Sequence, residues 1–365
     1  MNYLYFLYIE FLAKHNIPKI FGDITFYVIP ACIIFVALIL VILVLVLFER
    51  KLLGWFTQRK GPNRVGFWGV LQTLADAFKL LCKENITPIG ADRAVFNLAP
   101  IIMFLPVLIA LGLIPFSSEF TFMNFQTNVL IYVILATFPV LSILLAGWAS
   151  NNKYSLIGGV RNVAQILAYE LPISFTVLSV IVLASSMNLT QITLAQSNQY
   201  GVLGWYWFPC IIGFGLMLIC TLAELNRCPF DLPEAESELI AGYNTEYSGM
   251  RFALFYLSEY GMLFANSLFI SVLFLGGYLS PFGKYLSPIL FSGPVGNILI
   301  YFEQAFWLFA KSFLIIFIFI WVRATLPRLA SFDLLKFSWN ILLPLSIVNL
   351  LLMSLLKFFV GGVYA

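Results

Sequence analysis

The sequence contains almost no histidine, and its cysteines are not spaced for metal binding. His15 is the only histidine among 365 residues, which excludes haem or metal sites that need histidine ligands. The five cysteines include no Cys-x-x-Cys pair, so nothing indicates an iron–sulfur cluster or a zinc site. No segment matches the phosphate-binding patterns G-x-x-x-x-G-K-[ST] or G-x-G-x-x-G. We therefore expect no metal and no nucleotide on this chain.

Charged residues are also scarce. They make up 10% of the chain, against about 25% in soluble domains, and 61% of the residues are hydrophobic. A net charge of +3 is too small to indicate binding to nucleic acid. Together with a mean hydropathy of +0.96, these values exclude an ordinary soluble, disordered or disulfide-stapled protein. They predict an all-α, polytopic membrane protein.

Eight segments are apolar and long enough to cross a bilayer as helices, since about 20 residues are needed. They are residues 26–48, 95–115, 128–148, 160–184, 208–226, 252–278, 304–322 and 339–360. The run Asn2–Leu12 is too short to span and lacks the basic start and cleavage site of a signal peptide, so we expect it to lie at the membrane surface. The chain then divides into an interfacial segment (1–25), one eight-span membrane domain (26–360) and a short tail (361–365).

The loops carry an asymmetric distribution of charge. Most of the 20 basic residues fall in loops that follow odd-numbered spans. By the positive-inside rule these loops face the cytoplasm or matrix, so both termini lie on the outer side. The long inner loops are 49–94 and 227–251, and the first has an apolar stripe at helical spacing over Phe67–Leu81. Such an amphipathic helix is either a plain interfacial helix or the floor of a site for an amphiphilic ligand, beside Glu49 and Arg50.

Three carboxylates, Glu170, Glu224 and Glu259, fall within apolar helices or at their ends. An ionised carboxylate in the middle of a bilayer costs about 2.5–3.5 kcal/mol, so it is kept where it is protonated, paired or in contact with water. Each acid is therefore either part of an ionisable pathway or a structural acid with a basic partner. The basic residues that could pair with a structural acid are Arg161, Arg227 and Lys311.

The segment from Ala223 to Tyr247 concentrates further acids against a single base, Arg227. Its acidic residues are Glu224, Asp231, Glu234, Glu236, Glu238 and Glu246. Closely spaced carboxyl groups raise one another's pKa and titrate as a set, which suits a proton relay near neutral pH. The alternative is a solvated acidic loop. Pro229 and Pro233 prevent the segment from forming one continuous helix.

Several long motifs give these observations a common explanation. They include ERKLLGWFTQRKGPNRVG (49–66), LADAFKLLCKE (74–84), AQILAYE (164–170), AELNRCPFDLPEAESELIAGYNTEYSG (223–249) and WVRATLPR (321–328). From about Phe48 to Leu345 the chain resembles the quinone-binding membrane subunit of proton-pumping NADH:quinone oxidoreductase, respiratory complex I. After Pro327 and Arg328 the sequence departs from the pattern of that family.

The resemblance implies an activity and a set of site residues. In that family the subunit contains no redox centre and no covalently bound cofactor; it forms part of a chamber for ubiquinone or another quinone and couples quinone reduction to proton translocation. In this chain the residues of the chamber entrance and wall would be Glu49, Arg50, Arg59, Ala77, Phe252, Tyr256 and Arg323. The acids of the proton relay would be Glu170, Glu224, Asp231, Glu234, Glu236, Glu238, Glu246 and Glu259.

The resemblance also implies partners and a location. NAD, FMN and iron–sulfur clusters belong to peripheral-arm subunits next to the quinone site, and small and antiporter-like subunits continue the membrane arm. A composition rich in Phe, Ile and Asn favours the mitochondrial inner membrane over a bacterial cytoplasmic membrane. Two alternatives remain: a stand-alone proton-coupled secondary transporter, although the inverted repeats typical of that class are not evident, and the equivalent subunit of a plastid-type or hydrogenase-type complex.

Overall fold

The computed structural model describes residues 19–197, 201–231, 240–283 and 294–360, and these residues form helices and loops without strands. The expected all-α class is confirmed. In chain order the helices are α2 (Lys19–Phe56), α3 (Gln72–Cys82), α4 (Arg93–Leu113), α5 (Asn128–Ala149), α6 (Lys153–Ala184), α7 (Leu189–Ala195), α8 (Ile211–Glu224), α10 (Gly249–Phe274), α12 (Pro294–Thr325), α13 (Ser331–Phe337) and α14 (Leu343–Val360). A π-helical turn joins α13 to α14.

Seven helices in the described part of the chain are long and apolar enough to cross a membrane, where we expected eight. The difference is the segment 208–226, which forms only the 14-residue helix α8. At 1.5 Å per residue this helix is about 21 Å long, shorter than the roughly 30 Å hydrocarbon core. It stops at Glu224 because Asn226 adopts a left-handed backbone conformation (φ 51°), which is typical of the residue after a helix.

Helices also extend beyond the apolar runs that predict them. The first span was expected to begin at residue 26, but α2 is already helical at Lys19 and continues to Phe56. Similarly, α6 begins at Lys153, seven residues before the expected span. Hydropathy identifies the part of a helix in hydrocarbon, whereas the backbone hydrogen bonds continue into more polar surroundings. The expected surface run Asn2–Leu12 and the tail 361–365 lie outside the described residues.

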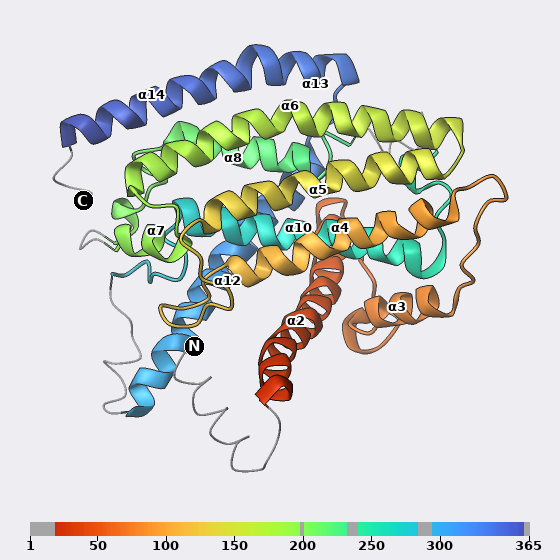
Figure 1. The fold of residues 1–365 in the computed structure, drawn as a ribbon, viewed down its shortest axis with the longest axis horizontal. Coiled ribbons are helices and arrows are strands. Elements are labelled where there is room, and N and C mark those ends of the chain that lie inside the picture. Colours follow the sequence, from red (N-terminus) through yellow and green to blue (C-terminus); the bar gives the residue numbers. More distant parts are fainter. Residues whose placement is uncertain (1–18, 198–200, 232–239, 284–293, 361–365) are drawn as a thin grey trace.

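Helix α10 forms the centre of the bundle. Every residue from Tyr260 to Phe274 is buried, because α4 and α12 pack along α10 and α2, α3, α7 and α8 also contact it. Figure 1 shows α14 lying along α6 at one edge of the molecule, and α2 and α12 running obliquely to the other long helices. The most central helix therefore also carries Glu259, one of the acids expected to be functional.

Two lysines of the last helices bind backbone oxygens at the carboxyl-terminal ends of α10 and α6. The Lys311 Nζ of α12 donates to the backbone oxygens of Leu275, Gly277 and Leu279, at 2.7, 2.8 and 2.6 Å, just after α10. The Lys357 Nζ of α14 donates to the Val182 oxygen at 2.6 Å, near the end of α6. The last carbonyl groups of a helix have no partner within it, and a cation there also interacts favourably with the helix dipole. Lys311 thus binds carbonyl groups rather than a membrane acid.

We expect the substitution Lys311→Met to destabilise the fold, because three backbone oxygens would lose a buried donor. Each buried polar group left without a partner costs about 1–3 kcal/mol. The matched control is Lys357→Met at the partly exposed end of α6, where water can replace the ammonium group and the effect should be smaller. Thermal melting of the detergent-solubilised protein measures both. Melting of Lys311→Met at the temperature of the unmodified protein would contradict this role.

Candidate functional site

A buried ion pair joins the ends of three helices. Glu49, in the last part of α2, is only 3% exposed. Its Oε2 accepts from Arg227 Nη1 at 2.6 Å, and its Oε1 accepts from Arg323 Nη1. Arg227 follows the end of α8, and Arg323 lies in the last turn of α12. We call these three residues the ion-pair cluster.

Arg227 also connects this cluster to α10. Its guanidinium carbon lies 4.6 Å from the centre of the Tyr260 ring, which is a cation–π contact. Burial acts to lower the pKa of Arg227, but the neighbouring Glu49, Tyr260 and Glu259 outweigh it and raise the pKa, so the guanidinium stays charged. The cluster therefore holds a permanent positive charge against the central helix.

A cavity opens beside the ion-pair cluster, and we call it the Arg227 cavity. It contains about 970 Å³ of space, part of it open to the surroundings. Its lining residues are Leu225, Asn226, Arg227, Cys228, Asp231, Ala241, Asn244, Phe252, Tyr256, Glu259, Tyr260 and Arg323. Two arginines face one side, while Phe252 and Tyr256 of α10 stack with their ring centres 6.4 Å apart. The walls therefore offer hydrogen-bond donors and flat apolar surface to one ligand.

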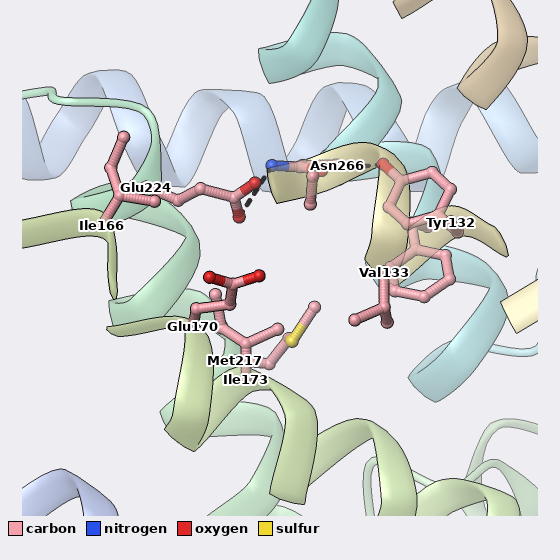
Figure 2. A pocket seen from close by; sticks show the side chains of 10 residues that line it. Tyr132, Val133, Ile166, Glu170, Ile173, Met217, Glu224 and Asn266 are labelled. Atoms are coloured by element: carbon pink, nitrogen blue, oxygen red, sulfur yellow. Dashed lines mark hydrogen bonds between the residues drawn. The ribbon is translucent and has the colours of Figure 1, made fainter. Parts of the chain in front are cut away.

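A second cavity lies deeper, between α5, α6, α8 and α10, and we call it the Glu224 cavity. Figure 2 shows the carboxylates of Glu170 and Glu224 pointing toward each other across it. Asn266 Nδ2 donates to Glu224 at 3.3 Å, and the Tyr132 hydroxyl donates to the Asn266 oxygen at 2.7 Å. Much of the remaining wall is apolar. Two carboxylates that line one cavity in such surroundings repel each other when both are charged.

The structure separates the predicted relay acids into groups. Glu170 and Glu224 line one cavity, while Asp231 and Glu259 line the other. Glu246 lies apart and accepts from Asn152 at 2.7 Å. The described acids of the 223–247 segment thus do not form one crowded set. The other three acids expected in the relay, which lie outside the described residues, are Glu234, Glu236 and Glu238.

The predicted quinone residues are also divided. Phe252, Tyr256 and Arg323 line the Arg227 cavity, and Glu49 supports it through both arginines. The other three are not among its lining residues. Arg50 pairs with Asp76 of α3 at 2.5 Å, Arg59 donates to Thr57 at 3.1 Å, and Ala77 is half-buried on α3.

Several residues of the two cavities were missed by the sequence analysis. Tyr243 donates to Glu259 at 2.9 Å, Asn266 donates to Glu224, and Tyr132 donates to Asn266. Asn266 had a detectable signal: it lies seven residues, or two helical turns, after Glu259, so both are on one face of the same apolar helix. Tyr132 and Tyr243 had no such signal, because no helical spacing relates them to Asn266 and Glu259, which are 134 and 16 residues away.

No group of three His, Cys, Asp or Glu side chains in the described ranges could hold a metal ion. Seven apolar helices around buried charges and acid-lined cavities define a multi-pass membrane protein with an ionisable interior. The chain belongs to the NADH dehydrogenase family, whose model matches residues 29–354. The resemblance stated from the motifs is therefore confirmed.

Curated relatives agree with this assignment. The H subunit of NADH-quinone oxidoreductase from Brevibacillus brevis is 40% identical over 343 residues, covering 94% of this chain and 96% of the relative. The H subunits of the same enzyme from Bacillus cytotoxicus and Bacillus mycoides are each 44% identical over 313 residues, covering 86% of this chain and 88% of the relative. The expectation of a subunit of an oxidoreductase complex is confirmed. These relatives are bacterial and give no support to the mitochondrial location.

We expect Arg227→Gln to destabilise the protein, because it leaves Glu49 buried with one partner fewer. Breaking a buried ion pair from one side costs about 3–5 kcal/mol. Adding Glu49→Gln should cost less than the sum of the single changes, since the second change removes the stranded charge. Asp76→Asn is the control: it breaks a half-exposed pair and should cost under about 1 kcal/mol. Unfolding in SDS is measured for Arg227→Gln, Glu49→Gln, the double variant and Asp76→Asn. If the effects of the two single changes simply add in the double variant, the coupling is ruled out.

Proposed function

We propose that the chain is the membrane subunit of an NADH:quinone oxidoreductase that forms part of the quinone site and couples quinone reduction to proton movement. One observation carries this proposal. Two arginines, two stacked aromatic rings and two acids line the Arg227 cavity, and a second pair of acids lines the Glu224 cavity in the same bundle. The names of the relatives support the assignment to such a complex.

The Arg227 cavity has the chemistry that a quinone needs. A guanidinium group has five N–H donors, and the ion pair with Glu49 occupies only part of them, so Arg227 and Arg323 can also donate to quinone carbonyl oxygens. Phe252 and Tyr256 provide flat surface for the ring. Arg50, Arg59 and Ala77 belong, in this proposal, to the entrance on the membrane surface.

Reduction of a quinone to a quinol takes up two electrons and two protons. The electrons come from partner subunits that carry NAD, FMN and iron–sulfur clusters. Glu259 and Asp231 lie in the wall of the Arg227 cavity, where they can respond to the charge on the bound quinone. Glu170 and Glu224, with Asn266, then continue the pathway toward the membrane arm.

The proposed setting is a bacterial cytoplasmic membrane, as the bacterial relatives indicate. In this proposal α8 also crosses the bilayer, as a short eighth span that local thinning of the bilayer accommodates. The positive-inside rule then puts both chain termini outside and α3 in the inner surface. Leu74, Phe78 and Leu81 of α3 are exposed, which fits contact with lipid. Peripheral-arm subunits then cover the Arg227 cavity, and small and antiporter-like subunits adjoin the bundle. A stand-alone transporter is disfavoured because the relatives are named as subunits.

We expect Phe252→Ala to raise the KM for quinone roughly tenfold with less effect on kcat. Contact with a Phe side chain contributes about 1.5–3 kcal/mol, and 1.4 kcal/mol corresponds to a factor of ten. The control is Phe306→Ala, which removes a ring that is exposed on α12. Steady-state NADH:quinone turnover of the assembled complex gives both constants. An unchanged KM in Phe252→Ala would remove this ring from the quinone site.

We expect Glu224→Gln to lower coupled quinone reduction about tenfold or more, while the complex still assembles. The amide has nearly the same shape but does not exchange protons as a carboxyl group does, and positioned proton transfer contributes roughly 10²–10⁴-fold. Glu84→Gln is the control, since Glu84 is exposed and lines neither cavity. Turnover and proton translocation in membrane vesicles provide the measurement. Wild-type rates and proton ratios would refute the relay.

A further inference from the structure

Two amide side chains of α6 point into the protein without full partners. Asn162 is completely buried, and both its Oδ1 and its Nδ2 lack a hydrogen-bond partner among the described residues. Gln165, one turn further on, is 3% exposed, and its Oε1 also lacks a partner there. A buried amide without hydrogen bonds costs several kcal/mol, so such groups are normally satisfied by ordered water.

Asn162 lies between the two cavities. One turn before it on α6, Gly158 packs closely against the 3-10 turn Gly242–Asn244, since an added Cβ there would lie 2.9 Å from the Gly242 Cα. This turn holds Tyr243, whose hydroxyl binds Glu259 of the Arg227 cavity. One turn after Asn162, Ile166 lines the Glu224 cavity.

Gln165 binds the backbone next to both cavities. Its Nε2 donates to the backbone oxygens of Ala223 and Phe230, at 2.9 and 2.8 Å. Ala223 directly precedes Glu224, and Phe230 directly precedes Asp231, so Gln165 touches the chain next to an acid of each cavity. Three side-chain atoms on adjacent turns are thus left without a partner in the described part of the chain. Asn162 Nδ2 is a donor, and Asn162 Oδ1 and Gln165 Oε1 are acceptors.

We propose that Asn162 and Gln165 bind an internal water that links the acids of the Arg227 cavity to those of the Glu224 cavity. A water molecule has two donors and two acceptors, and two to four polar partners are enough to hold one inside a protein. The water accepts a proton on one side as it releases another on the opposite side, so no net charge stays on it. Asn162 does not exchange protons itself; it is a positioning residue.

This inference rests on the proposed function, and its test separates the two. The variants are Asn162→Leu, which keeps the branched shape but removes both polar atoms, and Asn162→Ser, which supplies a hydroxyl group and leaves room for water. Glu224→Gln reports on the relay as a whole. Asn349→Leu is the matched control, because Asn349 is also a fully buried asparagine but binds Ser179, away from both cavities.

NADH:quinone turnover and proton uptake are measured for the assembled complex in vesicles, in H₂O and in D₂O. We expect Asn162→Leu to reduce coupled turnover roughly fivefold and to increase the ratio of the rates in H₂O and D₂O, because proton transfer then limits the reaction. Asn162→Ser should restore most of the turnover. Asn349→Leu should leave the isotope ratio unchanged.

Three results would overturn the water link. The first is wild-type turnover and isotope ratio in Asn162→Leu while Glu224→Gln is impaired; if Glu224→Gln is also unaffected, the proposed function fails too. The second is an equal loss in Asn162→Leu and Asn162→Ser, which would mark a requirement for shape. The third applies even if Asn162→Leu does not assemble: a density map of the unmodified complex that resolves other buried waters but none between Asn162 and Gln165.

Discussion

The contact of Glu49 with Arg227 and Arg323 is the interaction on which the rest of the site depends. Hydrophobic packing holds apolar helices together but fixes their rotation and height only loosely, because lipid is as apolar as leucine. A buried charge permits much less freedom, since moving one partner away leaves an unpaired ion in a poor solvent. The ion-pair cluster therefore sets how α2, α8 and α12 meet, and this meeting point is a wall of the Arg227 cavity.

The two cavities use charge differently. The Arg227 cavity combines fixed positive charge with acids, and in the proposed function it binds the quinone ring. In the Glu224 cavity two carboxylates face each other, and its remaining polar groups include an amide and a phenol; in the proposed function this cavity passes protons. α6 contacts both, because Glu170 lines the Glu224 cavity and Gln165 donates to the backbone oxygen of Phe230, next to Asp231 of the Arg227 cavity.

The sequence alone predicts the all-α class. It also identifies Glu170, Glu224 and Glu259 as candidate site residues, because an acid inside an apolar helix is costly and therefore conspicuous. It does not predict the partner of Glu49, since Arg227 is 178 residues away and many arrangements of helices satisfy the same hydropathy pattern. It also overestimates the length of α8: the apolar residues before Ile211 count toward a span, although they are not part of the helix. Composition shows where polarity is unusual, and only packing shows what that polarity contacts.

The lysine contacts at the ends of α6 and α10 have a consequence for biosynthesis. Lys311 and Lys357 lie in the last two long helices; Lys311 binds a carbonyl group 36 residues before it, and Lys357 binds one 175 residues before it. The ribosome therefore makes α6 and α10 before it makes the lysines that bind the carbonyl groups at their ends. Completion of these contacts therefore depends on the carboxyl-terminal helices, and a chain truncated before Lys311 lacks both lysines.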